Sequence, residues 1–182
     1  MGYIFDPARL QEICKPALGL EREEMVETII GELARAYPGH IETRQNWVFN
    51  IAGGITGIMN VLHGSMTEYL LLFGTPGGTD GFSGRYLLDI YDVVLSGRMK
   101  TYEDDTPLKA RTFEPGELAL LRKGRVKGVS FSEDNFMLEY GRGFIASSLP
   151  YALVSANDPG IILKTVWIYG RLVVKEILGG KL

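Results

Sequence analysis

The feature that most constrains the fold of this chain is the sequence pattern of residues 47–145, in which short apolar runs alternate with turn signals. The turns include Gly53-Gly54, Ser96-Gly97 and Lys123-Gly124. The candidate strands between turns are residues 69–73, 86–95, 117–121, 126–131 and 136–140. Frequent short strands separated by such turns are typical of an antiparallel β-sandwich or β-barrel. The acidic stretch at residues 100–106 is predicted to be a solvated loop.

Helices are predicted on both sides of this β-rich region. Asp6 provides an N-cap before Pro7, which suits the first helical position. A second helix follows, whose apolar face is formed by Met25, Val26, Ile29, Ile30, Leu33 and Tyr37. Near the other end of the chain, Pro150 and Asp158-Pro159 can each open a helix.

The last predicted helix has an unusually wide apolar surface. Lys164, Arg171 and Lys175 fall in one narrow stripe, and aliphatic residues with Trp167 and Tyr169 fill most of the remaining circumference. Such a surface suits a helix that lies in a membrane interface. It equally suits a helix that packs on the core and keeps its charges in water, so the residues leave both alternatives open.

The composition excludes several functional classes. A formal net charge of -3 gives no reason to expect a nucleic-acid partner. The single cysteine, Cys14, excludes an intramolecular disulfide. Two histidines are too few for a histidine-rich metal site, so no metal and no cofactor are expected. His63 is more simply explained as a structural histidine than as a catalytic base.

Sequence motifs for nucleotide binding, serine hydrolysis and membrane insertion are also missing. The glycine-rich residues 74–84 lack the Lys-Ser/Thr of a P-loop, and no Gly-x-Ser-x-Gly elbow occurs. The first residues do not resemble a signal peptide. The longest uncharged stretch, residues 45–67, contains asparagines and four glycines, so a membrane-spanning helix is not expected there.

Two carboxylates stand out because each lies within an apolar strand. In a strand over 86–94, Asp92 shares a face with aliphatic residues, and Glu139 lies in the apolar run 136–140. A buried acid must be paired, hydrogen-bonded or protonated. The simpler alternatives are a solvent-exposed strand end for Asp92 and a surface ion pair with Arg142 for Glu139.

The two acids would be more informative if both pointed into one barrel. Desolvation and like charge would then raise the pKa of at least one of them. The pair could hold a single proton near neutral pH and so present an acid and a base side by side. The same pair would also attract a lipophilic cation.

Several segments resemble a known family. They are residues 65–75 (SMTEYLLLFGT), residues 83–86 (SGRY) continuing through Asp92 to Ser96-Gly97, residues 114–117 (EPGE) and residues 137–143 (MLEYGRG). These segments resemble fungal C-8 sterol isomerases and the sigma non-opioid receptor. The resemblance runs from about Asn46 to the C-terminus, with several motifs in order.

This resemblance implies a mainly β, α+β fold, in which a cupin-like β barrel carries N-terminal helices and two C-terminal membrane-facing helices. The expected organisation is one domain over residues 1–182, with a helical segment at 1–45, the β barrel at 46–146 and the C-terminal helices at 147–182. Family members carry an N-terminal membrane helix, and this sequence begins after the point where that helix would end. The family also implies a homo-oligomer and peripheral or monotopic membrane association. The membrane would be the endoplasmic reticulum in a eukaryote or the cytoplasmic membrane in a bacterium.

The resemblance also implies site residues. The family's two essential carboxylates fall on Asp92 and Glu139, and the aromatic residue that supports the second acid falls on Tyr69. The positions that line or brace the ligand pocket fall on Phe73, Met59 and Tyr86. Where the receptor carries tryptophans, this chain has Ile55, Phe131 and Phe136, so the outline of the pocket is expected to differ.

The implied function is a sterol Δ8-to-Δ7 isomerase, which moves a ring double bond by protonation and deprotonation without a cofactor. The alternative is a non-catalytic, receptor-like binder of lipophilic amines or steroids. A third possibility is a cupin-like barrel that binds another apolar molecule. The expected partners are therefore a sterol or other apolar small molecule, lipophilic amines, a membrane surface and further copies of the chain.

Overall fold

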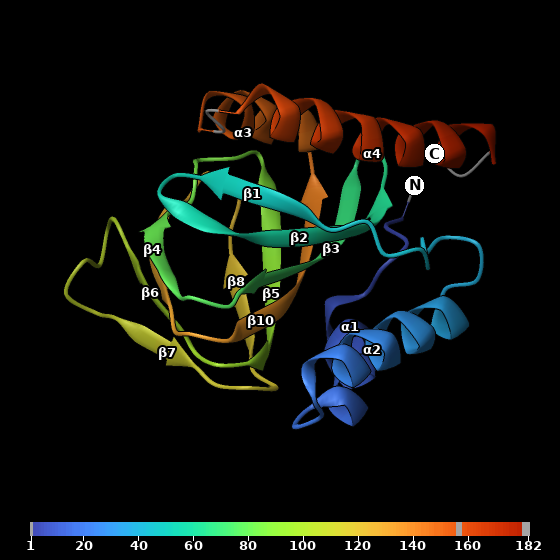
Figure 1. Ribbon diagram of the computed structural model, residues 1–182. Coiled ribbons are helices and arrows are strands. Elements are labelled where there is room, and N and C mark those ends of the chain that lie inside the picture. Colours follow the sequence, from blue (N-terminus) through green and yellow to red (C-terminus); the bar gives the residue numbers. More distant parts are fainter. Residues whose placement is uncertain (1, 156–157, 180–182) are drawn as a thin grey trace.

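The computed structural model describes residues 2–155 and 158–179, and two antiparallel sheets form its body (Figure 1). The six-stranded sheet has the order β1-β2-β3-β10-β5-β8, and the four-stranded sheet has the order β4-β9-β6-β7. The strands are β1 (Val48–Ala52), β2 (Ile55–Gly64), β3 (Glu68–Thr75), β4 (Thr79–Phe82), β5 (Leu88–Ser96), β6 (Met99–Glu103), β7 (Arg111–Phe113), β8 (Leu118–Leu121), β9 (Lys127–Phe131) and β10 (Asn135–Gly143). The prediction of a mainly β fold with flanking helices is confirmed.

Two details differ from the sequence-based expectation. Within residues 2–155 and 158–179 the strands form two separate ladders rather than one closed barrel, and both sheets contribute to one cavity wall. Part of the acidic stretch expected as a loop forms β6, because Lys100 and Thr101 pair with β7 on one side and β9 on the other. The Gly53-Gly54 pair closes a tight β1–β2 hairpin, and both glycines have positive φ angles (59° and 87°) as such turns require.

The N-terminal helices cover one face of the six-stranded sheet. They are α1 (Pro7–Cys14), the 3-10 turn η1 (Lys15–Ala17) and α2 (Arg22–Ala36). The α1 helix begins as predicted, since the Asp6 side chain accepts a hydrogen bond from the Arg9 backbone N–H at 2.8 Å. The apolar face of α2 packs against Leu72, Leu138 and other fully buried residues of the sheet. This face of the sheet is therefore filled with close-packed side chains.

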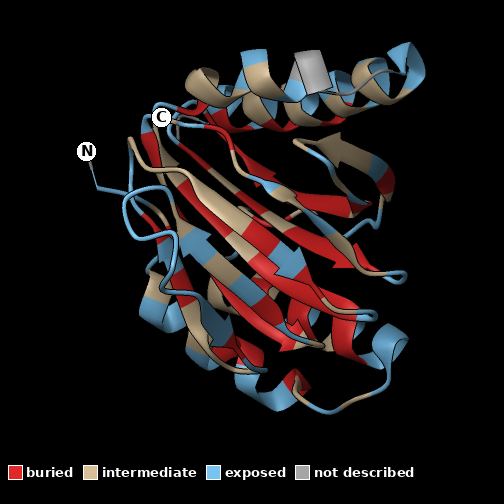
Figure 2. Ribbon diagram, turned by 90° about the vertical axis from the view of Figure 1, so that its left-hand side faces the viewer, coloured by how far each residue is buried: buried red, intermediate tan, exposed pale blue. Residues whose placement is uncertain are grey.

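The C-terminal helices lie on the side of the molecule opposite α1 and α2 (Figure 1). They are the 3-10 turn η2 (Ile145–Ser148), α3 (Leu149–Ser155) and α4 (Pro159–Leu178). The α4 helix buries Ile168 and Leu172 against β1 and β2, and leaves Trp167 73% exposed. Figure 2 shows the same contrast between buried strands and a largely exposed helical layer. No helix of the described residues is long and apolar enough to cross a bilayer.

The basic stripe of α4 lies along the body of the molecule. The Lys164 ammonium donates to the Trp47 carbonyl oxygen at 3.0 Å, and Arg171 forms an ion pair with Glu42 at 2.9 Å. The outer surface of α4 is left apolar. It thus combines both features that the sequence left open, a packed inner stripe and an exposed apolar outer face.

Register assigns alternate residues of the central strands to two different environments. On β10, Leu138 and Tyr140 belong to the core beneath the N-terminal helices, whereas Met137 and Glu139 face the other way. Glu139 lies directly opposite Asp92 of β5. The strand pattern therefore sends both acids to the face that the N-terminal helices do not cover.

Candidate active site

A cavity of about 550 Å³ lies on this second face of the sheet. Its walls come from both sheets, and residues of α3 and α4 complete them. Most of the lining side chains are apolar. The few polar groups include Asp92, Glu139, Lys127 and Tyr69. A large apolar cavity with a few converging polar groups is the usual form of a small-molecule site.

Asp92 and Glu139 are brought together by the pairing of β5 with β10. Residues directly opposite in an antiparallel pair have Cβ atoms about 4.5–5.5 Å apart and point to the same face. Both residues line the cavity, and Asp92 is only 1% exposed. A solvent-exposed strand end for Asp92 was therefore the wrong alternative.

Glu139 is held by Tyr69, which lies on the neighbouring strand β3. The Tyr69 hydroxyl donates to Glu139 Oε1 at 2.6 Å. Its ring lies over Gly141, where any side chain would clash with it. The surface ion pair with Arg142 is not formed, because the Arg142 guanidinium instead donates to the Tyr91 hydroxyl at 2.6 Å.

The environment of Glu139 changes its proton affinity. Burial, together with the negative charge of Asp92, raises its pKa from 4.5 to about 7, although Tyr69 and Lys127 both act in the opposite direction. The Glu139 carboxyl is therefore close to half protonated at neutral pH. Such a group can both give and take a proton under physiological conditions.

The sequence-based reasoning missed Lys127. Its ammonium group lies 2.5 Å from Asp92 Oδ2, and the two side chains are 11% and 1% exposed. Residues 126–131 are a predicted strand, and Lys127 is the first residue of the observed strand β9. Alternation along that strand places Lys127 on the face of Val129 and Phe131, which would have been the available signal.

The ion pair with Lys127 leaves one oxygen of Asp92 available. Asp92 Oδ1 is buried and has no hydrogen-bond partner in the part of the chain that the structure describes. An ammonium group beside a carboxylate favours its ionised form. The site thus combines an Asp92 that is paired with Lys127 and a Glu139 whose pKa is raised to about 7.

The remaining predicted pocket residues all line the cavity; they are Ile55, Met59, Phe73, Tyr86 and Phe131. The rings of Phe73 and Phe131 meet with centroids 5.5 Å apart. Tyr86 is held by its hydroxyl, which accepts a hydrogen bond from the Gly84 backbone N–H at 2.8 Å. Phe136 lies on the opposite face of the sheet, beneath the N-terminal helices, and does not contribute to the cavity. The roles of these residues stay predictions.

Comparisons with known proteins give relatives along nearly the whole chain. The sigma non-opioid intracellular receptor 1 of Danio rerio is 37% identical, over 97% of this chain and 80% of that protein. The C-8 sterol isomerase ERG2 of Gibberella zeae is 36% identical, over 99% of this chain and 79% of that protein. Among solved structures, an RmlC-like cupin from Shewanella frigidimarina is similar with a TM-score of 0.46 and 11% identity, over 55% of this chain and 85% of that chain.

The family model described as "ERG2 and Sigma1 receptor like protein" matches residues 1–181. This match covers both the β-rich region and the C-terminal helices. Together with relatives that are more than 30% identical over most of their own length, it settles the assignment that the sequence motifs predicted. The chain belongs to the ERG2 and Sigma1 receptor like protein family.

Proposed function

We propose that this protein is a sterol isomerase that shifts a ring double bond from Δ8 to Δ7 inside the cavity. Relatives named as C-8 sterol isomerases, from Gibberella zeae and Aspergillus fumigatus, are 36% and 34% identical over nearly the whole chain. The observation that carries the proposal is the position of Glu139. It has a pKa of about 7 and lies directly opposite Asp92 in an apolar cavity.

In the proposed mechanism, protonated Glu139 delivers its proton to one carbon of the ring alkene. A tertiary carbocation forms at the neighbouring ring carbon. The ionised Asp92 and the faces of Phe73 and Phe131 stabilise this cation, because such interactions are strong where water is excluded. A carboxylate then removes a proton from the next ring carbon, which completes the shift of the double bond. The catalytic residues are thus Asp92 and Glu139, and Tyr69 positions Glu139.

The direction of proton transfer follows from Lys127. Because Lys127 is paired with Asp92, Asp92 is the member of the pair that stays charged, and Glu139 is the member that carries the proton. With Glu139 protonated, the three groups have no net charge, which suits an uncharged sterol. Removal of that proton leaves one net negative charge, which suits an ammonium ion.

The alternative function is a non-catalytic binder of lipophilic amines or steroids. Relatives named as sigma non-opioid intracellular receptor 1 support it, at 37% identity in Danio rerio and 41% in Gallus gallus. The same cavity would hold the ligand, with its ammonium group against ionised Glu139. Both functions need both carboxylates, so only turnover distinguishes them.

The test is incubation of purified protein with a Δ8 sterol, with the Δ7 product detected by gas chromatography and mass spectrometry. We expect product from the wild type and none from Glu139→Gln or Asp92→Asn. Asp80→Asn is the matched control, since Asp80 lies exposed on β4, outside the cavity wall. Tight amine binding without any Δ7 product would support the receptor-like function instead. Lipids that co-purify with the protein would reveal another apolar ligand.

We further propose that the exposed apolar side of the C-terminal helices rests on a membrane. Its residues include Leu163, Trp167 and Val174. An apolar patch of this kind fits a peripheral or monotopic attachment. The inner sides of the same helices line the cavity, so a sterol could reach it from the lipid phase. The membrane would be the endoplasmic reticulum in a eukaryote or the cytoplasmic membrane in a bacterium, and the chain would form a homo-oligomer.

A further inference from the structure

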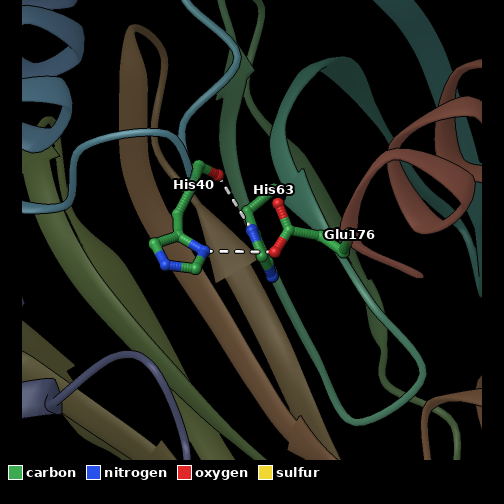
Figure 3. Close-up of side chains that lie close together, drawn as sticks. All are labelled: His40, His63 and Glu176. Carbon is green, nitrogen blue, oxygen red and sulfur yellow. Dashed lines mark hydrogen bonds and ion pairs between the residues drawn. The ribbon is translucent and has the colours of Figure 1, made fainter. Parts of the chain in front are cut away.

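A second group of chemically versatile side chains lies outside the cavity and takes no part in the proposed reaction. His40 follows α2, His63 lies on β2 and Glu176 lies near the end of α4 (Figure 3). One ligand atom from each residue lies within 4.8 Å of the others. His63 is 1% exposed and Glu176 is 3% exposed. Three separate elements therefore bring together two imidazoles and one carboxylate, of which only His40 is partly exposed.

The hydrogen bonds of His63 leave one ring nitrogen without a partner. Its Nδ1 lies 2.9 Å from the His40 carbonyl oxygen, and a carbonyl only accepts, so Nδ1 carries the proton. The lone pair is then on Nε2, which is buried and has no hydrogen-bond partner among residues 2–155 and 158–179. A buried polar atom without a partner is costly and commonly marks a bound water or ion.

Glu176 is equally unusual for its position. It is a buried acid on the inner side of a helix that otherwise presents Ile168 and Leu172 to the body. Its Oε2 lies 3.1 Å from His40 Nδ1. A carboxylate in such surroundings requires a positive partner, and a metal ion supplies one more effectively than a neutral imidazole.

We propose that His40, His63 and Glu176 form a binding site for a divalent transition metal ion such as Zn²⁺. Two imidazole nitrogens and a carboxylate oxygen are a common zinc ligand set, with water in the fourth position. The hydrogen bond from His63 Nδ1 to a backbone carbonyl is the support that metal-binding histidines usually have. The sequence-based expectation was that no metal binds, and it depended only on the small number of histidines.

The geometry requires a modest contraction on metal binding. Ligand atoms around a tetrahedral zinc ion are about 3.4 Å apart, because the bonds are about 2.0–2.1 Å long. The His40–Glu176 contact of 3.1 Å is already near that spacing. Because no two ligand atoms of the set are more than 4.8 Å apart, a bound ion would shorten the longest separation by at most about 1.4 Å.

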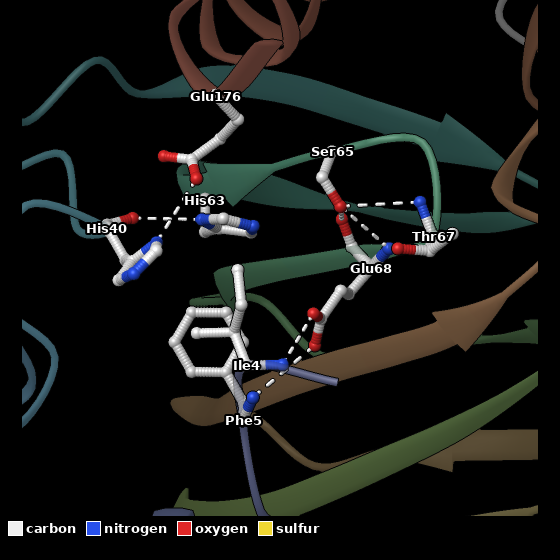
Figure 4. Close-up of polar contacts among 8 residues, drawn as sticks. All are labelled: Ile4, Phe5, His40, His63, Ser65, Thr67, Glu68 and Glu176. Atoms are coloured by element: carbon white, nitrogen blue, oxygen red, sulfur yellow. Dashed lines mark hydrogen bonds and ion pairs between the residues drawn. The ribbon is translucent and has the colours of Figure 1, made fainter. Parts of the chain in front are cut away.

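A bound ion would fasten α4 to the body of the protein. It would join α4 to β2 and to the loop that follows α2, beside the residues that hold the N-terminal segment (Figure 4). Other residues of α4, among them Ile161, Thr165 and Tyr169, line the cavity. The metal would therefore stabilise one wall of the ligand site without contacting the ligand.

The test uses the full chain, freed of metal by chelator and titrated with ZnCl₂ in a calorimeter. We expect one Zn²⁺ per chain, and a melting temperature that rises with Zn²⁺ concentration, as mass action requires for an ion that binds the folded state. Co²⁺ in place of Zn²⁺ should give the visible d–d bands of a four-coordinate ion. Neither readout depends on sterol turnover.

Two variants and one matched control locate the site. Glu176→Gln preserves the size of the side chain and His40→Ala alters a partly exposed residue, so both should fold. Each removes a direct ligand, so Zn²⁺ binding should weaken by at least the roughly 10–100-fold that loss of a ligand's supporting partner costs. Glu42→Gln is the control, because Glu42 also ties the loop after α2 to α4, through Arg171, but lies outside the cluster. It should bind Zn²⁺ like the wild type. The proposal is overturned if the wild type binds no stoichiometric Zn²⁺, or if Glu176→Gln and His40→Ala bind it as tightly as Glu42→Gln does.

Discussion

Two glutamates on neighbouring strands, Glu68 buried and Glu139 half-buried at the cavity, show how the two faces of the central sheet differ. Glu68 begins β3 and is 2% exposed, yet its carboxylate accepts hydrogen bonds from the Ile4 and Phe5 backbone N–H groups and from the Tyr140 hydroxyl. Figure 4 shows the contacts of Glu68 with the N-terminal segment. Glu139 on β10 has one donor, Tyr69, and otherwise faces an apolar cavity and the charge of Asp92.

The difference lies in the number of donors and in the surroundings, because Glu68 is buried among protein groups whereas Glu139 is half-buried at the cavity. Three donors hold the Glu68 carboxylate, which attaches the N-terminal segment to the sheet. Glu139 lacks such support, so desolvation and Asp92 raise its pKa to about 7. We therefore expect Glu68, which donors surround, to be structural, and Glu139, which the cavity leaves short of donors, to be chemically active. The following predictions separate the two roles.

The largest effect is expected for Glu139→Gln. The amide cannot deliver a proton, so turnover of a Δ8 sterol should fall by roughly 10²–10⁴-fold, the usual contribution of a general acid. The variant should remain folded, because the amide removes a desolvation cost and still accepts a hydrogen bond from Tyr69. Product formation and circular dichroism on the same sample would check both statements. A Glu139→Gln protein with wild-type turnover would remove Glu139 from the mechanism.

Lys127→Met should affect both stability and ligand choice. It leaves the buried Asp92 carboxylate unpaired, and breaking a buried ion pair costs about 3–5 kcal/mol. The folded fraction should bind lipophilic amines more tightly than the wild type, since the cavity gains a net negative charge. Denaturant unfolding and competition binding measure these quantities. Unchanged amine affinity would show that Lys127 does not set the charge of the site.

Glu68→Gln should reduce stability and leave turnover unchanged, whereas Glu139→Gln should reduce turnover and leave the protein folded. Loss of charge-assisted hydrogen bonds to two backbone N–H groups should lower the free energy of unfolding by about 2–3 kcal/mol. Turnover per folded molecule should be retained, because Glu68 lies outside the cavity wall. Urea unfolding and an activity assay normalised to folded protein test this prediction. A loss of turnover as severe as that of Glu139→Gln would break the distinction between the two acids.

Stability should also depend on pH through Glu139. Its pKa is raised in the folded state, so between about pH 4.5 and 7 the folded protein binds more protons than the unfolded chain. The contribution of Glu139 to stability is thus fully present below about pH 4.5 and is lost as the pH rises through about 7. Glu139→Gln should lack this component in a pH series of unfolding free energies. Turnover should decline above about pH 7, since the acid form disappears.

The smallest effect is expected at the outer face of α4. Trp167→Glu places a charge where the indole is 73% exposed, so the free energy of unfolding should change by no more than about 0.5 kcal/mol. Binding to liposomes should nevertheless weaken, because an interfacial helix depends on its apolar surface. A flotation assay with Lys109→Glu as a surface control would test this. Equal flotation of both variants would contradict the proposed membrane contact.

Periodicity and turn chemistry were sufficient to predict much of the fold. The N-cap at Asp6, the helix start at Asp158 and the apolar face of α2 depend on local rules, and the structure bears them out. The β1–β2 hairpin was missed, although Gly53-Gly54 marked its turn, because its asparagines and glycines obscured the strand pattern. Local rules also do not determine whether two sheets close into one barrel.

The site was partly accessible from the sequence. Asp92 and Glu139 were conspicuous because each interrupts an apolar strand, but their pairing depends on the register of two strands far apart in the chain. Lys127 and Glu68 were missed because a charged residue at the end of a strand usually faces water. The approach of His40, His63 and Glu176 is likewise a tertiary event that no sequence spacing encodes.

The central claim is that Glu139 carries a proton near neutral pH because desolvation in an apolar cavity, together with the charge of Asp92, raises its pKa. The most direct test is an NMR titration of the Glu139 side-chain carboxyl, labelled with ¹³C, in the wild type and in Asp92→Asn. We predict a midpoint near pH 7 in the wild type and a clearly lower midpoint in Asp92→Asn, because Asp92 raises the pKa of Glu139. A midpoint near the ordinary 4.5 in the wild type, or the same midpoint in both proteins, would contradict the proposed acid.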